Sequence, residues 1–227
     1  MKGSEKRLVQ KVLGLSLLDR KSRILEVSCG SGDHLSVMKE LTGASVFGLD
    51  LSFEGLKEKE QKDQNLNFLC AGSEVFPFRR ESFDFVYMID AIPSLKDWQL
   101  TLRGILEILK KRGEICIVTR SDQEMQEELL GRYFPSLVEA KRRRHPSAHR
   151  ISGALKSAGF RDLRSESWEG EILSGLNLLR SVENGTCPEL ALAPEDEMKE
   201  GLERLKSEVE PGSLFRVARY TLIRGRK

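Results

Sequence analysis

The sequence lacks any run of about 18 apolar residues, the minimum for a helix that crosses a bilayer. Its first residues, MKGSEKRLVQKVLGLSLLDRKSR, interrupt their leucines and valines with charged residues and contain no small-residue cleavage site. They therefore do not fit a secretory signal. Their apolar spacing instead predicts an amphipathic helix over residues 1–20. No membrane span is expected.

Cysteine is scarce and forms no C-x-x-C pair. The four cysteines are Cys29, Cys70, Cys116 and Cys187. This pattern excludes the dense disulfide framework of small secreted domains. Three of the four fall in or beside expected buried strands, where a free thiol behaves as a small hydrophobe. We therefore expect a reduced, cytoplasmic protein without a metal site.

A strong net charge is also missing, since 37 basic and 35 acidic side chains leave a formal charge of +2. The overall charge thus gives no evidence for a nucleic-acid partner. The exception is the basic stretch EAKRRRHPSAHR, residues 139–150, in which no aromatic side chains are available to stack on bases. Because charge runs are usually solvated, a nucleic-acid partner stays open but is not favoured. His34, one of only three histidines, is expected on a helix surface.

Hydrophobic residues make up 39% of the 227 residues, enough for one domain over residues 1–227 with a true core. Short apolar runs rich in Val, Ile and Phe predict strands at 23–29, 45–50, 67–72, 83–90 and 113–120. Helical patterns lie between them at 34–42, 53–62 and 96–110. Regular alternation of strand and helix predicts a doubly wound, Rossmann-like α/β fold.

The pattern changes after residue 120. Helices are expected near 122–132 and 151–160, a strand at about 160–169, mostly helix over 171–207, and a last strand at 214–227. We expect a seven-stranded, mostly parallel sheet with an antiparallel C-terminal edge strand. Residues 121–150 and 171–213 would then form helical cap elements on the substrate side.

The first strand leads into a glycine loop, ILEVSCGSGDHL, residues 24–35. The dinucleotide fingerprint G-x-G-x-x-G matches at Gly30 and Gly32 but meets Leu35 at its third glycine, and the phosphate-loop motif is absent. Asp33, the expected helix N-cap, would use the donors that a phosphate needs.

Two acidic residues flank this loop. Glu26 lies near the end of the first strand, and Asp50 ends the second, where an acid accepts both hydroxyls of a ribose. The ligand implied is a nucleoside with a ribose diol, a cationic part and little or no phosphate. S-adenosylmethionine fits that description.

Several segments resemble the class I S-adenosylmethionine-dependent methyltransferases, in particular their small-molecule, type 11-like members. ILEVSCGSGD is similar to the first motif, [DE]-x-G-x-G-x-G, and VFGLDLS to the second. AGSEVFPFRRESFDFVYMIDAIPSL resembles the third and fourth segments, and LRGILEILKKRGEICIVT the helix and fifth strand. HRISGALKSAGFRDLR is similar to the step into the sixth strand. The match follows the family order over about residues 20–120.

The resemblance implies a set of cofactor-binding residues at the carboxyl ends of the strands. They are Glu26, Ser28, Gly30, Gly32, Asp50, Leu51, Gly72, Ser73, Met88, Ile89 and Asp90. Three positions depart from the family pattern. Ser28 replaces the first glycine, and Gly72 replaces an aspartate that often contacts the adenine. Pro93 and Ser94 replace frequent histidines, so no histidine base is available there and no catalytic residue is identified.

The resulting hypothesis is methyl transfer from S-adenosylmethionine to an unidentified, small-molecule acceptor by direct in-line displacement, with the protein mainly aligning the reactants. The segment DAIPS lacks the [DNS]-P-P-[FYW] pattern of amino methyltransferases that act on bases, glutamine or nucleotides. Two alternatives stay open. One is an RNA or protein methyltransferase that uses the basic 141–150 stretch, and the other is a non-catalytic, nucleoside-binding partner protein. The oligomeric state is not predicted.

Overall fold

The computed structural model of the protein describes residues 2–51, 66–73, 76–120, 129–137, 145–184, 190, 193–209 and 215–227. The chain divides into two compact units. The first comprises Met1–Thr119, Ala148–Glu166 and Thr221–Lys227, and the second comprises Arg120–Ser147 and Ser167–Tyr220. The expected helix at 53–62 and residues 141–144 of the basic 141–150 stretch lie outside the described residues.

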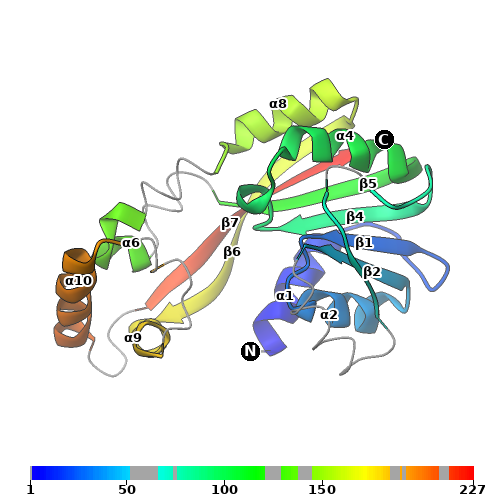
Figure 1. Ribbon diagram of the computed structural model, residues 1–227. Helices are drawn as coiled ribbons and strands as arrows, with labels where there is room; N and C mark the ends of the chain where they lie inside the picture. Colours follow the sequence, from blue (N-terminus) through cyan, green and yellow to red (C-terminus); the bar gives the residue numbers. More distant parts are fainter. Residues whose placement is uncertain are drawn as a thin grey trace. The chain divides into compact units, whose positions relative to one another are not determined.

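Strands of the described residues form a seven-stranded sheet in the order β3-β2-β1-β4-β5-β7-β6 (Figure 1). Their bounds are β1 Arg23–Val27, β2 Ser45–Asp50, β3 Asn67–Cys70, β4 Phe83–Ile89, β5 Leu109–Thr119, β6 Arg161–Ser174 and β7 Phe215–Arg226. The pairs from β3 through β5 are parallel, whereas β7 runs antiparallel to β5. The predicted mixed, doubly wound sheet is confirmed, but the expectation that the C-terminal strand forms its edge was wrong, because β7 lies between β5 and the edge strand β6.

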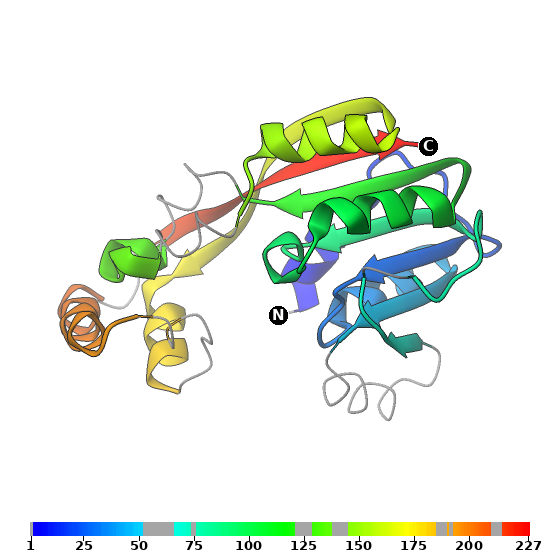
Figure 2. The same ribbon diagram turned by 45° about the horizontal axis from the view of Figure 1, so that its top comes forward.

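Helices of the first unit cover both faces of this sheet. Figures 1 and 2 show α4 (Trp98–Ile108) and α8 (Ala148–Ala158) on one face, and α1 (Lys2–Leu13) and α2 (Asp33–Thr42) on the other. Residues of β1 and β4 are almost all fully buried, which explains why these strands are nearly continuous apolar runs. Their side chains join those of α4 and α8 in the main hydrophobic core.

Several element boundaries differ from the sequence prediction. Strand β6 extends to Ser174 rather than to about residue 169, into a stretch that was expected to be helical. The N-terminal helix ends at Leu13 rather than near residue 20, because Gly14 adopts φ +55° and donates its N–H to the Gln10 carbonyl. The next leucines, Leu15 and Leu17, are 95% and 100% exposed. Helix α4 ends at Ile108 instead of residue 110, and β5 begins at Leu109.

Two side chains also lie elsewhere than the sequence predicts. Asp33 is the first residue of α2 and Gly32 is its N-cap, so the expected Asp33 cap was wrong. Cys70 is exposed because β3 forms the edge of the sheet, whereas Cys29 and Cys116 are buried as expected. Cys187 lies outside the described residues.

The second unit has a small core of its own. Helices α6 (Leu129–Tyr133), α9 (Gly175–Glu183) and α10 (Glu195–Glu208) contribute to it. Buried side chains of this core include Tyr133, Phe134, Val182 and Leu205. Gly201 allows close packing of α10, since an added Cβ would lie 2.5 Å from the Phe134 ring and 2.6 Å from the Tyr133 carbonyl. Across the described part of the chain, no helix is long and apolar enough to cross a membrane.

Gly48 of β2 provides a test of the packing between the sheet and α2. A Cβ at this position would lie 2.5 Å from Leu35 Cδ1 and 2.6 Å from Cys29 Sγ. We expect Gly48→Val to lower the free energy of unfolding by about 1–3 kcal/mol, the usual cost of overpacking a core. Urea denaturation measures the change.

Gly153 is the matched control, because it is exposed in α8 and an added Cβ would meet nothing within 4 Å. Gly153→Ala should raise the free energy of unfolding by about 0.5–1 kcal/mol through helix propensity. Equal effects of the two substitutions would contradict the packing of β2 described above.

Candidate functional site

A cavity of about 380 Å³ opens at the carboxyl ends of β1, β2, β3 and β4. Its size lies within the range of about 300–1,000 Å³ typical of small-molecule sites. Seven of the residues expected to bind a cofactor line it: Ser28, Asp50, Leu51, Gly72, Ser73, Ile89 and Asp90. The topology therefore brings most of the predicted site together in one place.

The glycine loop closes onto the end of β2 through backbone contacts. Gly30 donates its N–H to Asp50 Oδ2 at 2.8 Å, and Cys29 donates to the Leu49 carbonyl at 3.2 Å. The loop takes left-handed backbone angles at Ser28, Gly30 and Gly32, with φ of +57°, +49° and +70°. These contacts hold the Asp50 carboxylate at the wall of the cavity.

The two loop glycines have different surroundings. A Cβ on Gly32 would lie 2.7 Å from the Phe68 ring, so this glycine permits close packing of the loop on β3. Nothing lies within 4 Å of a Cβ on Gly30, so this glycine faces open space and its positive φ, rather than close packing, favours glycine there. Neither glycine contributes to the cavity wall itself.

Ser28 has the backbone of a glycine in spite of its side chain. A positive φ is uncommon for residues other than glycine, and asparagine and aspartate tolerate it best. The residue that replaces the family's first glycine therefore keeps the loop conformation that this glycine would allow. Asp90 at the end of β4 has a similar φ of +50°.

Glu26 and Met88 are buried and do not line the cavity. Met88 is fully buried in the main core. Glu26 is 2% exposed, and its carboxylate accepts a hydrogen bond of 2.9 Å from the Tyr87 hydroxyl. On its other side, His34 Nδ1 lies 3.3 Å from Glu26 Oε1. The expectation that His34 lies on the helix surface was therefore wrong.

Burial and pairing shift the pKa values of all three groups in this cluster. Desolvation raises the pKa of Glu26, although the hydrogen bonds from His34 and Tyr87 oppose the shift. Desolvation also raises the pKa of Tyr87 well above its usual range, and the adjacent Glu26 adds to this effect. For His34, desolvation lowers the pKa, but the hydrogen bond and charge of Glu26 outweigh it and the net pKa is raised.

Some cavity residues escaped the sequence prediction. They are Val27, Leu49, Ala71, Ala91, Ser94, Leu95 and Lys96. The last three follow β4 in and just after the short 3-10 helix η1 (Ile92–Ser94). Among the described cavity-lining side chains, Lys96 is the one basic residue. Its place in the sequence, shortly after the end of β4, was the only indication that it lies near the cavity.

Ser73 and Asp33 bear on the kind of ligand that fits. Thr101 Oγ1 of α4 donates a hydrogen bond of 3.1 Å to Ser73 Oγ, which holds the Ser73 hydroxyl at the cavity wall. The neighbouring Gly72 supplies no carboxylate to this wall. Asp33 occupies the first turn of α2 and accepts a hydrogen bond from Ser31 Oγ. A negative charge at this helix start disfavours a phosphate there, so the site fits a nucleoside better than a dinucleotide.

Comparison with known proteins identifies the family. The model of a family described as a methyltransferase domain matches residues 3–165. The chain belongs to this family. The match confirms the resemblance to the class I methyltransferases and the expected cofactor of the family, S-adenosylmethionine.

Relatives of this methyltransferase domain are similar over part of their length. The demethylmenaquinone methyltransferase of Lactococcus lactis is 35% identical over 104 residues, which cover 42% of this chain and 41% of the relative. The malonyl-[acyl-carrier protein] O-methyltransferase of Hamiltonella defensa is 28% identical over 172 residues, covering 69% and 66%. The chain thus spans about two fifths of the first of these relatives.

A solved structure agrees with the fold of this methyltransferase domain. The putative methyltransferase from an antibiotic biosynthesis pathway of Anabaena variabilis superposes with a TM-score of 0.80 at 19% identity, covering 96% of both chains. This likeness confirms the arrangement of strands and helices around the cavity.

Substitutions at Ser28 test the unusual backbone of the loop. Ser28→Val places a β-branched side chain at a positive φ, so we expect the free energy of unfolding to fall by about 1–3 kcal/mol. Ser28→Gly should leave it within about 1 kcal/mol of the original value, because the relief of strain offsets the greater freedom of the unfolded chain. Thermal and urea unfolding measure both, and a valine variant as stable as the glycine variant would refute the assigned backbone.

The raised pKa of His34 predicts a pH dependence of stability. A group whose folded pKa is raised contributes stability that is complete below its ordinary pKa, here 6.5, and is lost as the pH rises through the folded value. Compared with His34→Gln, the unchanged protein should therefore lose free energy of unfolding as the pH rises above about 6.5. The charged groups that face His34 are Glu26, Glu5 and Asp33.

The matched control for this measurement is His149→Gln, since His149 is exposed on α8. It should leave the pH dependence of unfolding unchanged. Parallel pH curves for the unchanged protein and His34→Gln, by urea denaturation, would show that His34 and Glu26 are not coupled.

Proposed function

We propose that this protein transfers the methyl group of S-adenosylmethionine to a small-molecule acceptor. The observation that carries the proposal is the cavity in which Ser28, Asp50 and Asp90 meet at the carboxyl ends of three parallel strands. Membership of the methyltransferase-domain family supports the same reaction class.

The residues around the cavity divide the work of binding. Asp50 would accept hydrogen bonds from the ribose hydroxyls. The hydrogen bond from the Gly30 N–H to Asp50 Oδ2 would hold the carboxylate in position for this role. The exposed side chain of Leu51, together with Gly72 and Ser73, would form the wall beside the adenine. Ile89 and Asp90 would lie near the methionine part. Glu26, Gly32 and Met88 would act indirectly by holding the loop and β4 in place.

The bound cofactor would supply a methyl group already activated by a sulfonium sulfur. The protein then needs mainly to align the acceptor with the methyl–sulfur bond and to exclude water. The described lining residues of the cavity include no histidine or tyrosine. A general base is required only for an acceptor that is protonated near neutral pH, and among the described lining residues that role would fall to a carboxylate such as Asp90.

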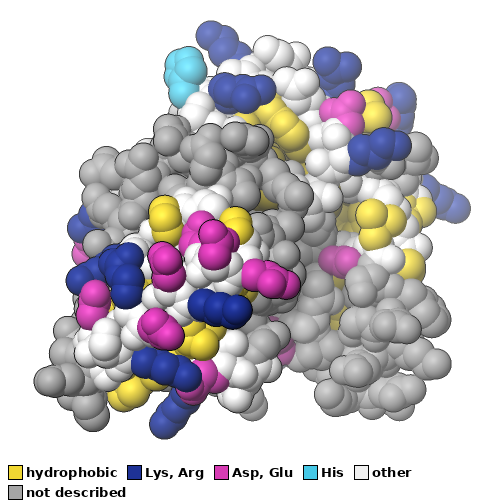
Figure 3. All heavy atoms as spheres, turned by 60° about the vertical axis from the view of Figure 1, so that its left-hand side comes forward, with side chains coloured by type: hydrophobic (Ala, Val, Ile, Leu, Met, Phe, Trp, Pro, Cys, Tyr) yellow, Lys and Arg dark blue, Asp and Glu magenta, His cyan; other side chains and the backbone are white. Residues whose placement is uncertain are grey.

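The relatives are named for demethylmenaquinone and for malonyl-[acyl-carrier protein], which favours a small-molecule or carrier-linked acceptor over a nucleic acid. The charge of the second unit points the same way. Helix α10 carries six acidic and three basic residues. Figure 3 shows acidic and basic side chains interspersed over the described residues of the face in view. An RNA acceptor would be supported by a basic stripe, and none is seen among the described residues of that face.

Calorimetric titration with S-adenosylmethionine, S-adenosylhomocysteine and NAD tests the cofactor assignment. We expect both sulfur nucleosides to bind and NAD to bind weakly or not at all. Asp50→Ala should weaken S-adenosylmethionine by about ten- to a hundredfold, since hydrogen bonds to a charged group contribute about 1.5–3 kcal/mol. Asp196→Ala, an exposed aspartate of α10, is the matched control and should bind as the unchanged protein does.

Failure of both sulfur nucleosides to bind would overturn the proposal. If they bind but Asp50→Ala binds equally well, the ribose role of Asp50 is wrong. A radiolabelled methyl-transfer screen over metabolites and over RNA would then separate the small-molecule reaction from the RNA alternative. Cofactor binding without any transfer would favour the non-catalytic partner protein.

A further inference from the structure

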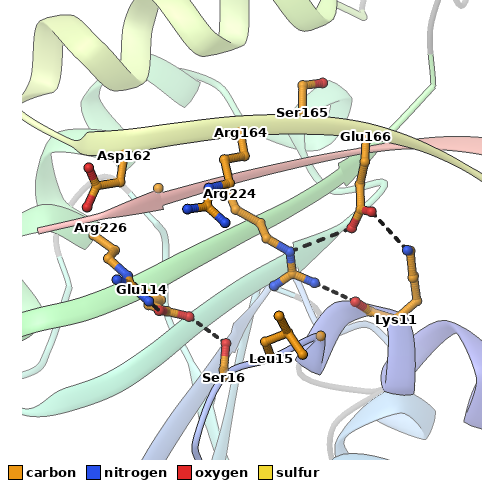
Figure 4. Close-up of a pocket in the computed structure, with 12 residues that line it drawn as sticks. Lys11, Leu15, Ser16, Glu114, Asp162, Arg164, Ser165, Glu166, Arg224 and Arg226 are labelled. Carbon is orange, nitrogen blue, oxygen red and sulfur yellow. Dashed lines mark hydrogen bonds and ion pairs between the residues drawn. The ribbon is translucent and has the colours of Figure 1, made fainter.

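A second cavity lies in the first unit and shares no lining residue with the cofactor cavity. It has a volume of about 560 Å³ and is formed by the end of α1, the segment after it, and parts of β5, β6 and β7 (Figure 4). Glu114 of β5 and its cross-strand neighbour Arg226 of β7 mark its position. Both lie toward the amino-terminal half of β5, whereas the cofactor cavity is at the carboxyl ends of the parallel strands.

Two of its acidic side chains are held by bases. Glu114 pairs with Arg226 at 2.6 Å and accepts a hydrogen bond from Ser16 Oγ. Glu166 pairs with Lys11 at 2.9 Å, and Arg224 Nε lies 3.9 Å from it (Figure 4). These contacts fix the walls of the cavity before any ligand arrives.

The lining has one more basic than acidic side chain. Besides the pairs above it contains Asp162 and Arg164, both exposed on β6. Asp162 lies near Arg226 and helps to raise the pKa of that guanidinium, although the main cause is the hydrogen bond to Glu114. Arg164 makes no hydrogen bond or ion pair within the described part of the chain. Its planar fork of donors is therefore available for an anion.

An apolar wall lies across from these charges. Leu15 lines the cavity and is 95% exposed, although a leucine gains free energy from burial. Gly14 brings this residue close to the sheet, because a Cβ at Gly14 would lie only 2.6 Å from the Arg224 guanidinium. A ligand with an apolar part would cover Leu15 and the aliphatic stems of the neighbouring basic side chains.

The geometry points to a binding site for a small organic carboxylate with a short apolar chain, its carboxylate on Arg164 and its chain on Leu15. Guanidinium and carboxylate form paired, charge-assisted hydrogen bonds, which give both strength and orientation. A single negative charge matches the one surplus positive charge of the lining.

Calorimetric titration with hexanoate, beside acetate and hexanol, tests this site on the full chain. We expect hexanoate to bind, with acetate and hexanol each binding more weakly because they lack the chain or the charge. Arg164→Gln should weaken hexanoate about tenfold, as expected for the loss of a charge-assisted hydrogen bond. Arg161→Gln is the matched control, since Arg161 is exposed on the same strand but does not line the cavity.

Leu15→Ser tests the apolar wall separately. It should weaken hexanoate and leave acetate unchanged. The site is refuted if hexanoate does not bind, if the two arginine variants bind it equally, or if saturating S-adenosylmethionine displaces it. Binding of S-adenosylmethionine itself should be unaffected by Arg164→Gln, so failure of this site and failure of the proposed function give different results.

Discussion

The buried carboxylate of Glu26 connects β1 and β4, which end at the candidate cofactor cavity, with α2, which follows the glycine loop. It belongs to β1, its hydrogen-bond donor Tyr87 belongs to β4, and His34 reaches it from α2. A carboxylate left unpaired at this depth would cost several kcal/mol, so each donor is needed once the glutamate is buried. The loop from Ser28 to Gly32 connects two of these elements, and its shape depends on how firmly they are held.

The sheet was predictable because its central strands are buried on both faces and therefore appear as nearly continuous apolar runs. The boundaries were less so. The leucines after Leu13 continue the apolar spacing of α1, yet Leu15 and Leu17 are exposed, and only the backbone turn at Gly14 distinguishes them. The start of β5 escaped prediction because its basic residues, Lys110 to Arg112, are typical of a helix C-terminus.

The candidate site was predictable where it depends on the ends of strands, as at Ser28, Asp50 and Asp90. It was not predictable where it depends on the rotation of a helix or on the path after a strand. The pairing of His34 with Glu26 requires that α2 turn one particular face toward β1. Lys96 reaches the cavity only through the turn at η1. Ser28 departs from the family pattern only in its side chain, since its backbone has the positive φ that a glycine would allow.

Because β3 is an edge strand, it exposes one cysteine that can be labelled selectively. Cys70 is exposed there, and its thiol points to the Leu51 carbonyl at 3.5 Å. Burial raises the pKa of Cys29, and that of Cys116 to about 12, so neither forms a thiolate near neutral pH. Among the described cysteines, an alkylating fluorophore would therefore attach to Cys70 first. Such a label would be attached next to Ala71 and close to Leu51, two residues that line the cavity.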